Sequence, residues 1–380
     1  MKIQHLQLKN FTAFTDLSID FSPGINIIIG ENGTGKTQLL KATLALCGPE
    51  ARGDSADERL AQQLCRLYMP MTSQVGELRR AGDRSEAVLR ATDALDREIR
   101  VRFAGNATQV KVTADAKCDL ALAIFIPTKE VLSLVRGLTS PQSDQQTIER
   151  IFDDAYVQLA NHLRTEDAAD LKRATQRNPR FSAIVPKLTN LIGGRYLLKD
   201  GSFCFQAGSY QDLKGQTTTD EELAPQAFKD SRLQFVRTPA QLLSSGMTAE
   251  GFRKIGVLQR LLSNGTLNPG VSGPLLWDEP ESNLNPKLMK DLVLALLELA
   301  RNGQQVILAT HDYVLLKWFD LLMNKGKGDH VVFHRLYRDQ GSDVIQRESR
   351  SDYSLVGRSA ISNAFAELYD EDVKRALGGE

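Results

Sequence analysis

The sequence lacks what several protein classes require. Its four cysteines, Cys47, Cys65, Cys118 and Cys204, are far apart and form no CxxC pair, which argues against both a zinc site and a disulfide framework. No stretch reaches the roughly 20 apolar residues of a membrane span, and no basic segment followed by an apolar run opens the chain. We therefore expect a cytoplasmic protein with reduced thiols and no membrane partner.

The chain also has no excess charge of either sign, because 47 Lys and Arg residues match 47 Asp and Glu residues. A polyanion site would therefore have to be a local patch. Sustained heptads and internal repeats are absent as well, which excludes long coiled-coil arms. With 380 residues, 42% of them hydrophobic, the chain can bury a substantial core, either as one domain with an inserted lobe or as two domains.

What is present begins with a glycine-rich segment, GENGTGKT, at residues 30–37. It follows INIII, which has the composition of a buried strand, and precedes a helix predicted from Gln38 to Cys47. In this context GxxxxGK[ST] predicts a phosphate site, in which Lys36 reaches the β and γ oxygens and Thr37 binds Mg²⁺. The alternative is a glycine turn with an incidental lysine. The predicted nucleotide-binding residues here are Asn32, Gly33, Thr34, Gly35, Lys36, Thr37 and Gln38.

Two later strands end in polar residues suited to phosphate chemistry. LLWDEP ends an apolar run with Asp278, placed to hold Mg²⁺, and Glu279, placed to orient or deprotonate an attacking water. QQVILATHD delivers His311 at the carboxyl end of another buried strand, where ligands gather in open α/β sheets. An acidic loop and a structural histidine are the alternatives. We predict that Glu279, His311 and Lys36 are catalytic.

Between these motifs lies LSSGM, a Ser-Ser-Gly turn before a helix with one apolar face. Such a turn is a second anion-binding device, although alone it is more typical of an ordinary N-cap. We include Ser244, Ser245 and Gly246 among the nucleotide-binding residues. Asn285 followed by Pro286 predicts the start of a helix that runs toward Arg301.

In this order the segments resemble the ABC-type ATPase head, a P-loop NTPase. GENGTGKT is similar to its Walker A motif, LSSGM to its signature, LLWDEP to Walker B, ESNLN to the D-loop and His311 to the switch histidine. The resemblance implies an α/β fold with a mixed core sheet, antiparallel N-terminal strands and an inserted, mostly helical lobe. It also implies ATP and Mg²⁺, and a homodimer in which Ser244 and Gly246 of one subunit meet the γ-phosphate held by Lys36 of the other. Asn285 then contacts nucleotide from the D-loop.

Three departures from that pattern bear on the hydrolysis rate, which we expect to be slow. Ser245 replaces the first glycine of the signature, Met247 its glutamine and Asn285 the D-loop aspartate. The start of the chain, LQLKNFTAF, resembles the RecF and SMC-like branch of AAA family ATPases, and so does the segment 121–165 with IFIPTKEVLSLVRG. The predicted units are an N-terminal head segment (residues 1–50), an inserted lobe (51–230), a C-terminal head segment (231–345) and a helical tail (346–380).

The middle of the chain is less informative. Residues 56–69 and 85–97 resemble short amphipathic helices, and IRVRF and TQVKVT resemble strands. A basic stretch contains Lys172, Arg173, Arg177, Arg180 and Lys187. That stretch suits a phosphate backbone, an acidic partner or simply a solvated helix end, so nucleic acid stays an open partner.

The tail predicts a helix around Trp318, a hairpin from HVVFHRLYR and VIQRES, and a last helix near 363–377. Because His330 and His334 fall in a strand, we interpret them as surface and half-buried positions rather than metal ligands.

The chain is thus similar to a bare ATPase head, without arms, hook or nuclease domain. In this compact form it resembles the ATPase subunits of bacterial anti-phage systems such as Septu and PARIS, which work with a separately encoded effector, often a nuclease. That resemblance implies an ATP-driven sensor and scaffold. The alternatives are a RecF-like repair ATPase that clamps DNA and a scaffold that binds nucleotide without hydrolysis. A transporter subunit fits least, because its signature would normally have two glycines.

Overall fold

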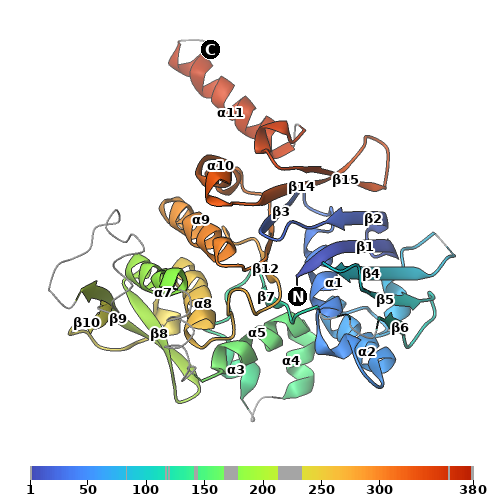
Figure 1. Ribbon diagram of the computed structural model, residues 1–380, viewed down its shortest axis with the longest axis horizontal. Coiled ribbons are helices and arrows are strands. Elements are labelled where there is room, and N and C mark those ends of the chain that lie inside the picture. Colours follow the sequence, from blue (N-terminus) through green and yellow to red (C-terminus); the bar gives the residue numbers. More distant parts are fainter. Residues whose placement is uncertain are drawn as a thin grey trace.

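The computed structural model describes residues 2–82, 84–115, 118, 120–140, 144–166, 179–212, 233–357 and 360–377. Within these ranges the strands form three sheets, of six, five and four strands (Figure 1). No helix in these ranges is long and apolar enough to cross a membrane.

The six-stranded sheet is the core sheet, and it positions the site. Its strands lie in the order β15 (Ile345–Arg350), β14 (Val331–Arg338), β3 (Ile25–Gly30), β13 (Val306–Thr310), β12 (Leu275–Asp278) and β7 (Ile124–Ile126). All neighbours pair in parallel except β14 and β15. Every residue of β3, β12, β13 and β7 is buried, as expected for strands covered on both faces. The predicted mixed sheet and C-terminal hairpin are confirmed.

The five-stranded sheet is antiparallel. Its order is β2 (Phe14–Asp20), β1 (Ile3–Phe11), β4 (Ala87–Asp93), β5 (Glu98–Phe103) and β6 (Lys111–Ala114). The prediction of a helix at 85–97 is wrong, because β4 pairs with both β1 and β5. Its buried Ala87, Leu89 and Ala91 alternate with half-exposed Val88 and Arg90, the period of a strand.

The third sheet has β9 (Ser202–Asp212) paired with β8 (Gly194–Lys199), β10 (Leu233–Arg237) and β11 (Leu243–Ser244). Helices α1 (Lys36–Leu46), α9 (Pro286–Arg301) and α10 (Tyr313–Leu322) follow β3, β12 and β13 of the core sheet. The others are α2 (Ala56–Tyr68), α3 (Val135–Thr139), α4 (Gln145–Ile151), α5 (Asp154–Arg164), α7 (Pro179–Ile192), α8 (Glu250–Ser263) and α11 (Ala360–Ala376).

The two faces of the core sheet belong to different hydrophobic clusters. Ile27 and Ile29 of β3 pack in the cluster that contains α7, α8 and α9, whereas Ile28 packs in the cluster that contains α1, α2 and the five-stranded sheet. Buried Gln305 ties the layers together, since its amide donates to the carbonyls of Ile3 (2.8 Å) and Ser22 (2.9 Å). The core sheet is therefore packed on both faces.

The inserted region 51–230 contributes to both larger sheets. It supplies β4, β5 and β6 to the antiparallel sheet and β7 to the edge of the core sheet. Lys172, Arg173 and Arg177 of the predicted basic stretch lie outside the described residues. In Figure 1 helix α11 extends away from the rest of the molecule, with the C-terminus at its far end.

Candidate nucleotide site

The glycine-rich loop joins β3 to α1, as predicted. Gly33 and Gly35 have φ values of 80° and 84°, in the left-handed region that glycine enters without penalty. A Cβ on Gly35 would lie 2.6 Å from the ring of Phe14, so the loop also needs a residue without a side chain there. Lys36 bends back over the loop, and its Nζ donates to the carbonyls of Gly30 (2.7 Å) and Glu31 (3.1 Å).

Burial and nearby negative charges have opposite effects on the pKa of Lys36. Burial lowers the pKa of its ammonium, while the carboxylates of Glu279 and Asp278 raise it. Removing a charged group from water is unfavourable unless an opposite charge compensates. An anion with several negative oxygens, placed against Nζ, would supply that compensation.

Asp278 lies at the end of β12 and accepts hydrogen bonds from two hydroxyl groups. The Oγ1 atoms of Thr37 and Thr128 donate to its Oδ2 at 2.8 and 3.0 Å. Its Oδ1 is buried without a hydrogen-bond partner in the described structure, and burial raises the pKa of the carboxyl. A hydroxyl beside a desolvated carboxylate is an all-oxygen donor set, which is the kind that Mg²⁺ prefers.

Protein side chains alone do not complete a metal site. No group of three or more His, Cys, Asp or Glu residues in the described ranges could hold a metal ion. A Mg²⁺ ion at Asp278 would therefore need further oxygens from water and phosphate, which is how this ion is usually bound in nucleotide sites.

Glu279 and His311 meet across neighbouring strands. Glu279 Oε1 lies 3.1 Å from His311 Nδ1, and both side chains are partly exposed. The Glu279 N–H donates to Ala309 O of β13 at 2.8 Å, and the residue has a φ of 47°. A side chain in this left-handed conformation costs about 1–2 kcal/mol. The turn directs the carboxylate away from β12 and toward the end of β13.

Three contacts around this site were not predicted. Thr128 follows β7 and contacts Asp278. Glu281 is buried and accepts a hydrogen bond from the hydroxyl of Thr310 at 2.6 Å. Lys254 of α8 is 1% exposed and donates to the carbonyl of Glu279 at 3.1 Å. For Lys254 the sequence does hold a signal, because this lysine lies on the apolar face of a predicted helix. Lysine is almost never fully buried without partners, so its position indicates a buried polar contact.

The LSSGM segment differs in detail from the prediction. Leu243 and Ser244 form the short strand β11, a 3₁₀ turn spans Ser245–Met247, and helix α8 begins at Glu250. The helix therefore starts after the turn and does not continue directly from it.

Exposure separates the members of this turn. Ser244 and Gly246 are exposed, whereas Ser245 is buried. The Ser245 carbonyl accepts from the hydroxyl of Thr248 at 2.7 Å and from Arg253 at 3.3 Å. Within the described residues, no hydrogen bond or ion pair joins Ser244, Ser245 or Gly246 to the glycine-rich loop of the same chain.

The remaining predicted residues lie on the loop or at a helix start. Asn32 and Gly33 are exposed, while Thr34 is buried and donates to Glu31 O at 2.8 Å. Gln38 accepts from the Ala13 N–H at 3.3 Å. Asn285 caps α9, since its side chain accepts from the Lys287 N–H at 2.9 Å.

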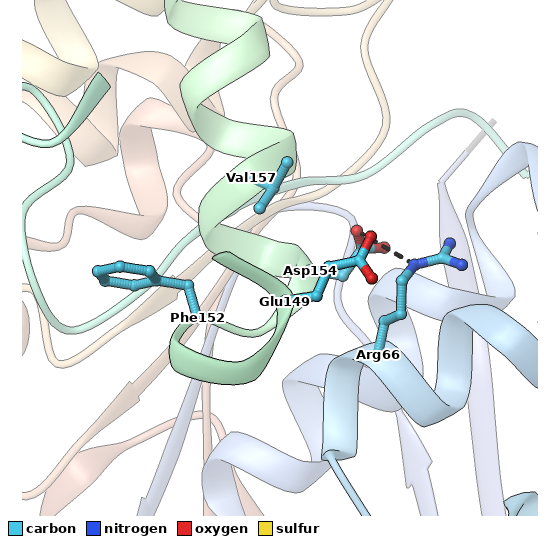
Figure 2. A pocket seen from close by; sticks show the side chains of 5 residues that line it. All are labelled: Arg66, Glu149, Phe152, Asp154 and Val157. Atoms are coloured by element: carbon cyan, nitrogen blue, oxygen red, sulfur yellow. Dashed lines mark ion pairs between the residues drawn. The ribbon is translucent and has the colours of Figure 1, made fainter. Parts of the chain in front are cut away.

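A small hollow lies elsewhere, between α2 and the helices α4 and α5 (Figure 2). Arg66 and Asp154 form an ion pair at 3.5 Å on its wall. Its lining includes no residue of the glycine-rich loop, β12 or β13, and at about 20 Å³ it holds roughly one water molecule. This hollow is therefore separate from the candidate site.

Loop, strand ends and sheet order together define a P-loop nucleotide site on an α/β core. Residues 25–317 match the family AAA_21, described as "AAA domain, putative AbiEii toxin, Type IV TA system". Since the match covers most of the chain, the protein belongs to this family of P-loop ATPases. Its fold is α/β, with one mixed core sheet and two antiparallel sheets.

Sequence similarity to RecF is partial. The chain is 29% identical over 155 residues to the DNA replication and repair protein RecF of Heliobacterium modesticaldum, which is 41% of this chain and 38% of that protein. It is 28% identical over 184 residues to RecF of Acidothermus cellulolyticus, covering 48% and 45%. The similarity thus spans less than half the length of these curated relatives.

Two solved structures are similar over nearly their whole length. The SMC head bound to the C-winged helix domain of ScpA aligns with a TM-score of 0.49 and 14% identity over 93% of this chain and 99% of that chain. RecF with ATPγS aligns with a TM-score of 0.41 and 16% identity, covering 91% and 97%.

Proposed function

We propose that the chain binds ATP with Mg²⁺ and hydrolyses it at the carboxyl ends of β3, β12 and β13. One observation carries this proposal. Thr37 contacts Asp278 at 2.8 Å while Glu279, the next residue, contacts His311 at 3.1 Å. These contacts support a metal-binding role for Asp278 and the role of base for Glu279, side by side near the glycine-rich loop, as phosphoryl transfer to water requires.

The residues then have distinct roles. Lys36 would hold the β and γ phosphates, and Thr37 with Oδ1 of Asp278 would hold Mg²⁺. When bound there, the metal would supply positive charge beside the phosphate oxygens. Glu279 accepts the proton of the attacking water, for which its carboxylate is partly exposed.

His311 keeps Glu279 oriented. His311 Nδ1 lies 3.1 Å from Glu279 Oε1, close enough to orient the carboxylate. The other ring nitrogen, Nε2, is then left to interact with a γ-phosphate oxygen. His311 would thus sense the γ-phosphate and the base together.

The LSSGM turn is proposed to complete the site of a second copy. Ser244 and Gly246 are exposed and have no contact with their own loop in the described chain. In a head-to-tail pair they would meet the γ-phosphate held by Lys36 of the other subunit, with Asn285 close by. ATP would then join two heads, and hydrolysis would release them.

For the biological role we propose a sensor and scaffold that holds a separately encoded effector in anti-phage defence. The family description names a toxin of a type IV TA system. This description favours a role together with a separately encoded partner protein. The names of the RecF relatives favour a second candidate, a repair ATPase that clamps DNA. A scaffold that binds ATP without turnover is the third, because Ser245 and Met247 depart from the usual signature.

A tagged pull-down of Glu279→Gln tests the role directly. The variant keeps Lys36, Thr37 and Asp278 but lacks the base, so ATP should accumulate in a trapped dimer. The native gene neighbourhood is expressed with it, and protein and nucleic acid are identified in eluates with and without ATP. A stoichiometric second protein that depends on ATP would support the effector hypothesis, whereas DNA alone would support the repair hypothesis.

Lys36→Ala is the matched control, because it should bind neither nucleotide nor any partner that requires ATP. Phosphate release by the unmodified protein and by Glu279→Gln is measured in parallel. Normal turnover by Glu279→Gln would discard Glu279 as the base. Tight ATP-dependent dimers of the unmodified protein without phosphate release would favour the non-hydrolysing scaffold.

A further inference from the structure

A buried lysine links helix α8 to the residue that carries the proposed base. Lys254 Nζ donates to the carbonyl of Glu279 at 3.1 Å and also donates to the hydroxyl of Ser282. Ser282 in turn donates to Thr128 O at 3.3 Å. Burial lowers the pKa of Lys254, while the charges of Glu281 and other nearby carboxylates raise it. Burying a charge this deeply costs free energy. The ammonium of Lys254 makes its hydrogen bonds with the turn.

The start of α8 lies directly on this turn. Asn283 Nδ2 donates to Glu250 Oε1 at 2.8 Å. A Cβ on Gly251 would lie 2.9 Å from Asn283 O, so backbone approaches backbone closely here. Glu279 and Asn283 both have positive φ, 47° and 59°. The helix therefore contacts both residues of the turn that adopt an unfavourable backbone conformation.

The neighbouring residue of α8 points to the signature turn. Arg253 donates to the carbonyls of Ser245 and Thr248 and forms an ion pair with Glu130 at 2.8 Å. Consecutive side chains of one helix thus hold two separate segments. Arg253 holds the Ser-Ser-Gly turn, and Lys254 holds the turn with Glu279.

We propose that Lys254 is a positioning residue that fixes the backbone of Glu279 and couples it to the Ser244–Met247 turn of the same chain. This rests on the proposed function, in which that turn meets a nucleotide and Glu279 serves as base. Three contacts pin Glu279: its N–H by Ala309, its carboxylate by His311 and its carbonyl by Lys254. A shift of α8, caused by nucleotide at the turn, would change the third contact. Occupancy of one ATP site would then adjust the base of the other.

The test compares Lys254→Met with Lys187→Met, which removes an exposed lysine from α7. Hydrogen exchange of the nucleotide-free protein is measured first, because it does not depend on hydrolysis. The amides of Ser282 and Leu284 donate within the turn, and they report on its order. Loss of a charged hydrogen bond should speed exchange of residues 279–285 about tenfold, with the rest of the chain and the Tm little changed.

Kinetics supply the second measurement. Lys254→Met should lower kcat about tenfold and change the Kd for ATP by less than about threefold. Added to Glu279→Gln it should cause no further loss, since both act through one carboxylate. Arg253→Met should speed exchange at 243–248 and also at 279–285, and the second effect should vanish when Lys254 is already Met.

Unchanged exchange at 279–285 in Lys254→Met, or equal acceleration throughout the chain, would overturn the proposal. If Lys254→Met does not fold, Ser282→Ala replaces it and should accelerate the same segment less. A wild-type protein without phosphate release would refute the proposed hydrolysis, while the exchange result still decides whether Lys254 positions the turn.

Discussion

Glu281 is a buried carboxylate beside the site with one oxygen unpaired in the described structure. It is 6% exposed, Thr310 donates to its Oε1, and its Oε2 has no hydrogen-bond partner in the described structure. Asp312 donates its N–H to the hydroxyl of Thr310 at 3.0 Å. Through the hydroxyl of Thr310, the carboxylate is therefore connected to the residues on both sides of His311.

The charge on Glu281 should cost stability at neutral pH. Burial raises its pKa above the ordinary value of 4.5, although the hydroxyl of Thr310 partly offsets this. The folded protein then binds the proton more tightly than the unfolded chain, so its stability falls as pH rises from about 4.5 through the raised value.

Glu281→Gln removes the charge and keeps an acceptor for Thr310. We expect the Tm of the variant, relative to the unmodified protein, to rise between pH 4 and pH 7. Thermal unfolding of the nucleotide-free proteins across this range measures the difference, with exposed Glu371→Gln as the control. A difference that stays constant with pH would mean that Glu281 is not the charged group responsible.

The sequence indicates some residues of the site because each lies at or shortly after the end of a buried strand. Glu279 and His311 directly follow β12 and β13, Asp278 ends β12, and Lys36 follows β3 across the glycine-rich loop; parallel strands end at one edge. Thr128 could not be assigned a role in this way. Its contact with Asp278 joins residues 150 positions apart, and only the pairing of β7 with β12 brings them together.

At the scale of elements, the hairpin β14–β15 is attached to β3 by a buried histidine. His334 is fully buried, its Nδ1 lies 2.8 Å from the hydroxyl of Ser349, and its Nε2 lies 3.2 Å from Asn26 Oδ1. Burial, with a smaller contribution from Arg347, lowers the pKa of His334 to about 3. The prediction of a half-buried position underestimated its burial.

This histidine should make the core sheet sensitive to acid. Because the folded pKa lies below the ordinary 6.5, the unfolded chain binds the proton first, and stability is lost as pH falls below 6.5. From pH 7.5 to pH 5.5 the loss should be about 1.4 kcal/mol.

Urea unfolding of the unmodified protein and of His334→Gln at these two pH values isolates this contribution. Gln retains groups that can bond to Ser349 and Asn26 but does not titrate. The unmodified protein should lose more stability than the variant, and equal losses would show that His334 is not the titrating group.

Elements of the core sheet were easier to predict than β4. Runs such as INIII and VILAT are buried on both faces and read as strands from composition alone. In β4, Ala and Leu favour helix as isolated residues, and pairing with β1 and β5 decides the outcome. The alternation of a strand is visible in the sequence, but it covers fewer residues than the helix predicted at 85–97.

At the scale of the whole molecule, the proposed site draws on two separate surfaces. The glycine-rich loop, Asp278 and His311 lie at the edge of the core sheet, whereas Ser244 and Gly246 are exposed beside β9, to which β11 pairs. Two such heads, arranged head to tail, would bring each turn to the loop of the other. The family resemblance of the sequence implies this pairing, but the exposure of the turn could be known only from the structure.

The variant Ser244→Arg tests whether the exposed turn is needed for dimerisation but not for ATP binding by the loop of its own chain. A long cation on the exposed turn should block the head-to-tail approach, while the loop around Lys36 stays unchanged. In the Glu279→Gln background, light scattering with ATP should report a monomer for Ser244→Arg and a dimer for the control Ser351→Arg. The Kd for ATP of the monomer should change by less than about threefold, since it keeps every contact of its own loop. Loss of both binding and dimerisation would contradict the assignment of Ser244 to the partner's site, as would a dimer that persists.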